Sequence, residues 1–185
     1  MPPIPDFNHN NVLPPHLGHP TNAGELSPYP STILEFCHRF ATSPERIDIL
    51  KGFLYFRLES TKHGIISGFQ WIDGSFIENI EVSENRPPHD IDAVSFVGNI
   101  DDTSKNNIVN NFRAFIDTKL SKAYYKVDHY IVEYDKHPLD TVYGTKYWIQ
   151  LFSHNRDGVW KGMIQIPLYS DSTRDNEALN FLNGL

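Results

Sequence analysis

The sequence is poor in cysteine, in basic residues and in long apolar runs. Its single cysteine, Cys37, cannot form a disulfide within the chain, and the setting ILEFCHRF predicts a small buried apolar residue. Lys and Arg number 16 against 23 Asp and Glu, and the net charge of -7 argues against a broad basic surface for duplex nucleic acid. No run reaches the roughly 20 apolar residues of a bilayer span, and the start MPPIPDFNHN lacks the basic and apolar parts of a leader. We therefore expect a cytoplasmic protein with no membrane insertion.

The composition is nevertheless that of a folded protein, with 39% hydrophobic and 13% aromatic residues in a chain of 185, enough for one domain with a sizeable core. Prolines concentrate at one end, since eight of the thirteen fall within residues 1–30. A fixed φ and a missing amide donor exclude proline from helix interiors and central strands. We expect residues 1–30 to form an extended Pro-rich arm packed on a single domain of residues 31–185. The eight are Pro2, Pro3, Pro5, Pro14, Pro15, Pro20, Pro28 and Pro30.

The rest of the chain alternates helical and strand patterns. Thr32 and Glu35 have the spacing of a capping box, and Ser43-Pro44 opens a second helix to about residue 60. An α+β fold follows, in which a small mixed sheet is flanked by helices. Further helices are expected at 104–120, 143–152 and 176–182, a polar loop at 78–89, and strands at 69–72, 91–97, 126–134 and 162–168.

The tripeptide Asp90-Ile91-Asp92 is the most informative chemical feature. Alternation along a strand places residues i and i+2 on one face, so the two carboxylates are at most about 7 Å apart. Like charges at that distance repel, and a divalent cation between them relieves the repulsion; Mg²⁺ prefers such oxygen ligands. Asp128, on the expected strand 126–134, is the natural third carboxylate of a two-metal site.

A second feature precedes this pair. Gly74-Ser75 closes the expected strand 69–72; the glycine permits close approach of backbone amides to a phosphate, and the serine hydroxyl adds a donor. Alone, each motif has an ordinary explanation, because Asp-x-Asp also occurs as a turn cap and Gly-Ser occurs by chance in loops. Together, Gly74-Ser75, Asp-x-Asp and Asp128 resemble the signature of the nucleotidyltransferase superfamily.

The resemblance extends over most of residues 4–168. IPDF with VLPP near the start, WIDGSF around Gly74 and the late NRDGVWKG look like a small bacterial family of functionally obscure nucleotidyltransferase-like proteins. It implies that Asp90, Asp92 and Asp128 bind two Mg²⁺ ions and that Asp128 helps to activate the attacking oxygen. It also implies that Gly74 and Ser75 hold the triphosphate of a nucleoside triphosphate.

The chain departs from the superfamily pattern near Ser75. Fourteen residues separate Ser75 from Asp90, slightly more than the superfamily usually shows, and Phe76-Ile77-Glu78 replaces a basic residue often found after the serine. Positive charge for the phosphates must then come from elsewhere. Lys161 is the residue we expect to bind nucleotide, and Arg86 and Lys126 are further candidates.

The function that these features imply is Mg²⁺-dependent transfer of a nucleotidyl group from a nucleoside triphosphate to an unknown acceptor, which could be a protein hydroxyl, an RNA end or a second nucleotide. A toxin-antitoxin or phage-defence system is the context that the resemblance suggests. The alternative is a catalytically silent module that senses a nucleotide or binds a partner protein through the same cleft. Walker A, G-x-G-x-x-G, G-x-S-x-G and C-x-x-C motifs are all missing from the sequence.

Overall fold

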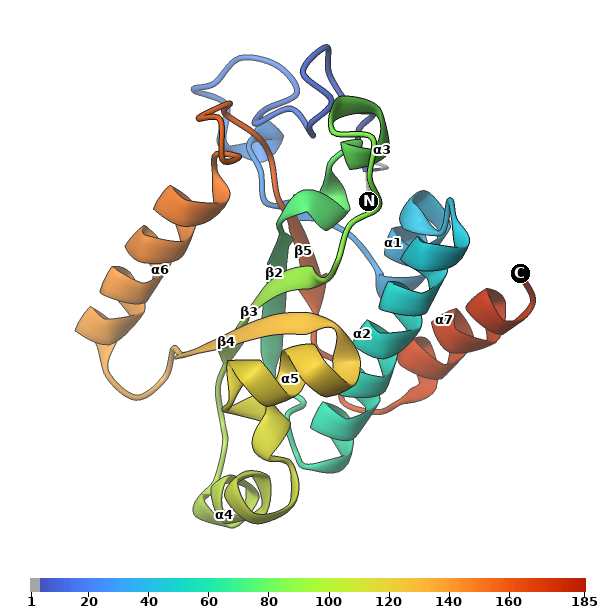
Figure 1. The fold of residues 1–185 in the computed structure, drawn as a ribbon. Helices are drawn as coiled ribbons and strands as arrows, with labels where there is room; N and C mark the ends of the chain where they lie inside the picture. The colour runs from blue at the N-terminus through green and yellow to red at the C-terminus, as the bar shows by residue number, and fades with distance from the viewer. Residues whose placement is uncertain (1–3) are drawn as a thin grey trace.

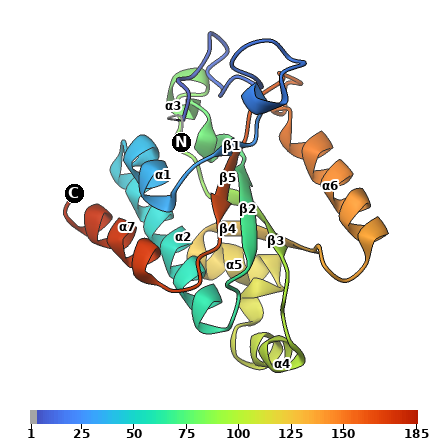
Figure 2. The same ribbon diagram turned by 180° about the vertical axis from the view of Figure 1, so that it is seen from behind.

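The computed structural model describes residues 4–185, so Pro2 and Pro3 of the expected arm lie outside the described residues. A five-stranded mixed sheet of order β1-β5-β2-β3-β4 forms the centre (Figures 1 and 2). β2 is antiparallel to both β3 and β5, whereas β3 with β4 and β1 with β5 are parallel. The strands are β1 Tyr29–Pro30, β2 Gly68–Asp73, β3 Ile91–Val97, β4 Val127–Glu133 and β5 Ile164–Pro167.

Helices flank this sheet, as the sequence predicts. α1, α2 and α7 pack together on one side, and α6 lies on the other side, against β4 (Figures 1 and 2). The four longer strand predictions are confirmed as β2 to β5, while the two-residue β1 is not predicted. The helices are α1 Ile33–Phe40, α2 Pro44–Lys62, α3 Ile80–Ser83, α4 Asp102–Asn111, α5 Thr118–Tyr125, α6 Pro138–Phe152 and α7 Thr173–Asn183.

Two helix starts are confirmed in atomic detail. The Thr32 hydroxyl accepts from the Glu35 amide and the Glu35 carboxylate accepts from the Thr32 amide, so the capping box of α1 is complete. Ser43 caps α2 through the Arg46 amide, with Pro44 in the first turn. Both segments therefore contain their own start signals, and Cys37 in α1 is buried and free, as expected.

The single helix predicted over 104–120 is wrong. The chain forms α4, then a 3₁₀ turn at Arg113–Phe115, then α5. Phe112 adopts φ −136° and ends α4, which lets the Phe112 and Phe115 rings pack on Phe56 of α2. Asp117 then caps α5 by accepting from two amides. Burial of the two rings outweighs continuation of the helix.

Three smaller expectations also need correction. α6 begins at Pro138, earlier than predicted. The expectation that Tyr147, Trp148 and Leu151 of this helix face inward holds only for Trp148, because Tyr147 and Leu151 are 59% and 50% exposed. The expected polar loop 78–89 contains the short helix α3. Residues 4–28 are mostly irregular, with Val12 buried in the body. Within residues 4–185, no helix has the length and apolar character needed to cross a bilayer.

Candidate functional site

Three aspartates form a row across the sheet. Asp73 at the end of β2 is in register with Asp92 of β3, and Asp92 is in register with Asp128 of β4. Residues in register share a face of a sheet, and neighbouring strands are about 4.8 Å apart, so the three side chains project side by side. Asp90 lies just before β3 and two residues from Asp92, which adds a fourth carboxylate. The structure thus brings the sequence-predicted Asp90, Asp92 and Asp128 together and adds Asp73, which the sequence analysis missed.

The row opens into a cavity of about 800 Å³. Its floor is acidic, formed by the row and by Glu78, and Gly74 and Ser75 line the same cavity. The remaining wall comes from the loop before β3, from α5 and from the turn after α6. These segments contribute the basic or titratable side chains Arg86, His89, Lys122, His154 and Arg156 and the acidic side chains Glu84 and Asp157.

Gly74 makes the turn between β2 and the 3₁₀ turn Ser75–Ile77. Its φ of 80° lies in the region that favours glycine, and a Cβ at this position would collide with the Asp92 carboxylate. The glycine therefore allows the carboxylate of β3 to lie directly against the backbone of the turn. The sequence predicts that a phosphate can approach the backbone at Gly74. On one side of Gly74 this space is filled by the Asp92 carboxylate.

Lys161 holds this turn from within the protein. Its ammonium lies 3.1 Å from Asp73 Oδ1, donates to Glu78 Oε1 at 2.5 Å and donates to the Gly74 carbonyl at 3.2 Å. The side chain is 2% exposed, and although burial opposes it, the carboxylates of Asp73 and Glu78 raise the pKa of Lys161. Lys161 therefore stays charged and tethers the Gly74 turn, and its expected contact with nucleotide stays a prediction.

Burial perturbs the carboxylates of the row. It raises the pKa of Asp73 to about 7, against the opposing effects of Lys161 and the Gly74 amide. Burial, followed by the negative charges of Asp90 and Asp128, raises the pKa of Asp92 to about 6. Both groups are thus poised near neutral pH, where a nearby cation favours their ionised forms.

A lysine that the sequence analysis missed neutralises part of this charge. Lys122 of α5 places its Nζ 2.6 Å from Asp90 Oδ2 and 3.4 Å from Asp128 Oδ2. Close contact with Asp90 raises the pKa of Lys122 above its ordinary value, so the side chain is cationic. The sequence gives no local signal for this contact, because α5 reaches the site only through its packing on β4.

Three buried carboxylate oxygens of this cluster have no hydrogen-bond partner among the described residues: Asp73 Oδ1, Asp90 Oδ2 and Asp128 Oδ1. The first two lie at ion-pair distance from Lys161 and Lys122, whereas Asp128 Oδ1 has no such cation beside it in the described chain. An unpaired buried carboxylate oxygen is costly, and a hard cation is the partner that it lacks. The carboxylates of Asp90, Asp92 and Asp128 thus have the donor chemistry that Mg²⁺ prefers. No group of three His, Cys, Asp or Glu side chains within residues 4–185 has an arrangement ready to hold a metal ion, and Lys122 lies between two of the proposed ligands.

The other expected cations differ in position. Arg86 lines the cavity but is paired with Glu84 at 2.6 Å. Lys126 pairs with Asp48 of α2 and does not line the cavity. Lys126 therefore provides no charge to the site.

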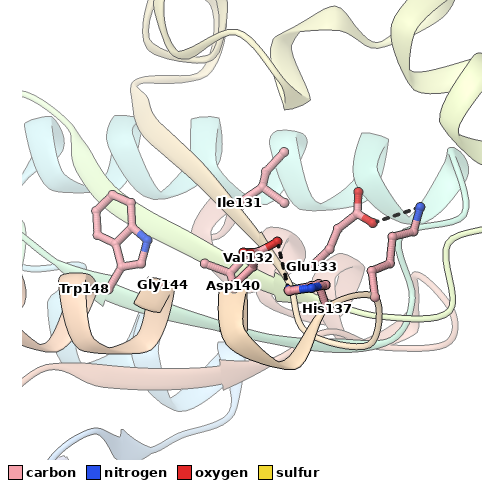
Figure 3. A pocket seen from close by; sticks show the side chains of 8 residues that line it. Ile131, Val132, Glu133, His137, Asp140, Gly144 and Trp148 are labelled. Carbon is pink, nitrogen blue, oxygen red and sulfur yellow. Dashed lines mark ion pairs between the residues drawn. The ribbon is translucent and has the colours of Figure 1, made fainter. Parts of the chain in front are cut away.

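A second cavity, of about 580 Å³, lies between β4 and α6 (Figure 3). Its charged side chains are already paired, Glu133 with Lys136 at 3.3 Å and His137 with Asp140 at 3.5 Å. Trp148 closes one end. This cavity has neither an unpaired buried oxygen nor a tight glycine turn among the described residues, so we place the candidate site at the aspartate row.

Comparison with known proteins identifies a family whose function is unknown. No curated protein matches the chain, and no solved structure matches it. One family model matches, over residues 5–167, which includes every residue of the aspartate row and Lys161. The chain therefore belongs to the family of unknown function DUF6932.

Proposed function

We propose that this protein is a Mg²⁺-dependent nucleotidyltransferase that uses a nucleoside triphosphate. The observation that carries the proposal is the meeting of Asp90, Asp92 and Asp128 beside the Gly74-Ser75 turn in one cavity. These segments are far apart in the sequence, and only the pairing of β2, β3 and β4 joins them. The order of the motifs on adjacent strands supports a nucleotidyltransferase-like fold.

The charge distribution in the cavity supports the same proposal. A metal-triphosphate complex presents a cation at one end and an extended anion at the other. The carboxylate floor suits the cation, and Arg156 on the wall suits the anion, next to Arg86 and Lys122, which are held in ion pairs. A simple metal store would not need the basic wall, and a simple anion site would not need the acidic floor.

In the proposed reaction, the acceptor oxygen forms a bond to the α-phosphorus, the bond from that phosphorus to the bridging oxygen breaks, and pyrophosphate leaves. Asp90 and Asp92 would hold Mg²⁺, which supplies charge neutralisation and a lower pKa for the acceptor hydroxyl. Asp128 would orient the acceptor and help to activate its oxygen, and the proton of the acceptor hydroxyl passes to water. The Gly74-Ser75 turn contributes amide and hydroxyl donors for the phosphates.

One observation favours a second function. Lys122 bridges Asp90 and Asp128 and compensates part of their charge within the protein itself. A silent module that binds a nucleotide or a partner protein in this cavity would have the same internal ion pair. Under either function the acceptor or partner stays open, and the toxin-antitoxin or phage-defence context stays a prediction.

Transfer can be tested on the purified chain with each of four labelled nucleoside triphosphates, with and without Mg²⁺. We expect Mg²⁺-dependent release of pyrophosphate and a labelled product. Asp92→Asn should reduce turnover at least about 100-fold, because it removes a ligand charge from the centre of the row. Asp140→Asn on α6 is the matched control and should keep wild-type activity, since Asp140 lies in the second cavity.

Full activity of the Asp92→Asn variant would contradict the assignment of the row. Thermal stabilisation of the wild-type chain by a nucleotide, without pyrophosphate release, would instead identify the silent binding module.

A further inference from the structure

Lys122 is the cation most closely engaged with the proposed metal ligands. It lies in the last turn of α5, which packs on β4 beside the site, and contacts Asp90 at 2.6 Å and Asp128 at 3.4 Å. Its side chain is 53% exposed, while the Asp90 and Asp128 side chains are 14% and 20% exposed. The acids are therefore fixed in the floor, whereas the lysine reaches them from solvent on a flexible four-carbon stem.

The charge of the row is only partly balanced by this contact. Asp90, Asp92 and Asp128 present three carboxylates to one cavity. One ammonium supplies a single positive charge, whereas a divalent cation supplies two and can also reach the unpaired Asp128 Oδ1. Lys122 contacts Oδ2 of both Asp90 and Asp128, and a divalent cation held by the same two carboxylates would lie next to the ammonium charge. The two positive charges repel at this distance, so they compete for the carboxylates.

Within residues 4–185, the segment directly after Ser75 supplies no cation for a phosphate. Phe76 and Ile77 are buried in the core, and Glu78 is paired with Lys161. Lys161 is engaged by three partners beneath the turn. A lysine released from the carboxylates would lie at the wall of the same cavity, within reach of an anion bound there.

We propose that Lys122 competes with a divalent cation for Asp90 and Asp128 and that, once displaced, it binds the phosphate groups of the nucleotide. This inference rests on the proposed function. It adds to that function a role for Lys122, which leaves the carboxylates of Asp90 and Asp128 and binds the phosphate groups instead. In the metal-free protein Lys122 keeps the carboxylates together; in the loaded protein it neutralises the triphosphate. Metal binding and triphosphate binding are thereby coupled.

The first test measures binding of Mn²⁺ alone by calorimetry, without nucleotide. Lys122→Met keeps most of the stem and removes the charge, so we expect Mn²⁺ to bind roughly tenfold more tightly than in wild type. Lys126→Met changes the net charge equally but lies outside the cavity, and should stay within about twofold of wild type at physiological salt. Thermal unfolding of each variant checks that the fold is kept.

The second test measures binding of inorganic tripolyphosphate, added as its Mn²⁺ complex. Lys122→Met should bind it roughly tenfold more weakly, the opposite of the change for Mn²⁺ alone, and Lys122→Arg should restore binding. Opposite changes for the two probes cannot come from general loss of structure, which would weaken both.

The outcomes separate the two proposals. If wild type binds Mn²⁺ and transfers nucleotide but Lys122→Met binds both probes as wild type does, the Lys122 inference is overturned and the proposed function stands. If neither wild type nor Lys122→Met binds Mn²⁺ at millimolar concentration, both proposals fail.

Discussion

Two polar rows cross the same sheet and face opposite sides. Gln70 of β2 is in register with Ser95 of β3, and both belong to the face covered by α2 and α5. Asp73 and Asp92, on the same two strands, belong to the opposite face and open into the cavity. The two rows differ by an odd number of residues along each strand, which is sufficient to place them on different faces.

The first row is a connected hydrogen-bond network. Arg57 of α2 donates to Asp175 Oδ1 and to Gln70 Oε1, each at 2.5 Å. Gln70 Nε2 donates to Ser95 Oγ at 3.0 Å, and the Ser95 hydroxyl donates to His129 Nε2 at 2.8 Å. His129 Nδ1 completes the network by donating to the Phe115 carbonyl at 2.9 Å.

The second row lacks this matching of donors and acceptors. Its members are all carboxylates, and its cations contact it from two sides. Three of its buried oxygens, Asp73 Oδ1, Asp90 Oδ2 and Asp128 Oδ1, have no hydrogen-bond partner among the described residues, against Asp175 Oδ2 alone in the first row. Matched buried groups stabilise a fold, whereas clustered like charges cost stability. The first row therefore stabilises the fold, and the cost of the second row is consistent with the binding role that we propose for it.

The largest effect is expected in the first row. Arg57→Met leaves the Asp175 carboxylate, 1% exposed, without its cation, and should lower the free energy of unfolding by about 3–5 kcal/mol in urea denaturation. The double variant Arg57→Met/Asp175→Asn removes the stranded charge as well and should recover part of the loss. Arg39→Met is a control with a more exposed ion pair and should cost less than about 1 kcal/mol. A loss for Arg57→Met as small as the loss for Arg39→Met would contradict the network's stabilising role.

A substitution in the second row is expected to raise the free energy of unfolding, by an intermediate amount. The pKa of Asp92 is raised from 3.8 to about 6, so the folded state holds its proton more tightly, and ionisation destabilises the fold as pH rises from about 4 to about 6. Asp92→Asn should therefore be more stable than wild type by about 2 kcal/mol at pH 8, with the gain disappearing near pH 4. Chemical denaturation across this pH range measures the difference in the free energy of unfolding. A difference that stays the same at every pH would show that ionisation of Asp92 does not destabilise the fold.

The smallest effect at neutral pH is expected at His129, where the pH dependence has the reverse sign. Burial lowers the pKa of His129 to about 3, so its contribution to stability is present above the unfolded value of 6.5 and is lost as pH falls toward 3. His129→Gln keeps a donor and an acceptor and should cost about 1 kcal/mol at pH 7. It should also reduce the loss of stability between pH 6 and pH 4. An unchanged acid slope in this variant would assign the slope to other groups.

The comparison also shows which parts of the molecule could be predicted. Strand β3 was predicted with its observed bounds because its β-branched and aromatic residues are continuous. The start of α1 was predicted because Thr32 and Glu35 cap it locally. The break in the helix expected over 104–120 was not predicted, because Phe112 and Phe115 turn toward Phe56, which lies 56 and 59 positions earlier in the sequence. Asp73 could have been noticed as the acid directly before Gly74, but Lys122 had no such signal.

The sequence by itself determined most of the helices and strands, and it indicated three carboxylates and a glycine turn as candidate site residues. Caps, periodicity and turn chemistry act over a few residues, so they can be recognised locally. Only the tertiary structure decided that Asp73 joins the row, that Lys161 lies beneath the turn and that Lys122 reaches Asp90. Strand register and the docking of α5 on β4 set those contacts, and both depend on packing between segments that are distant in the chain.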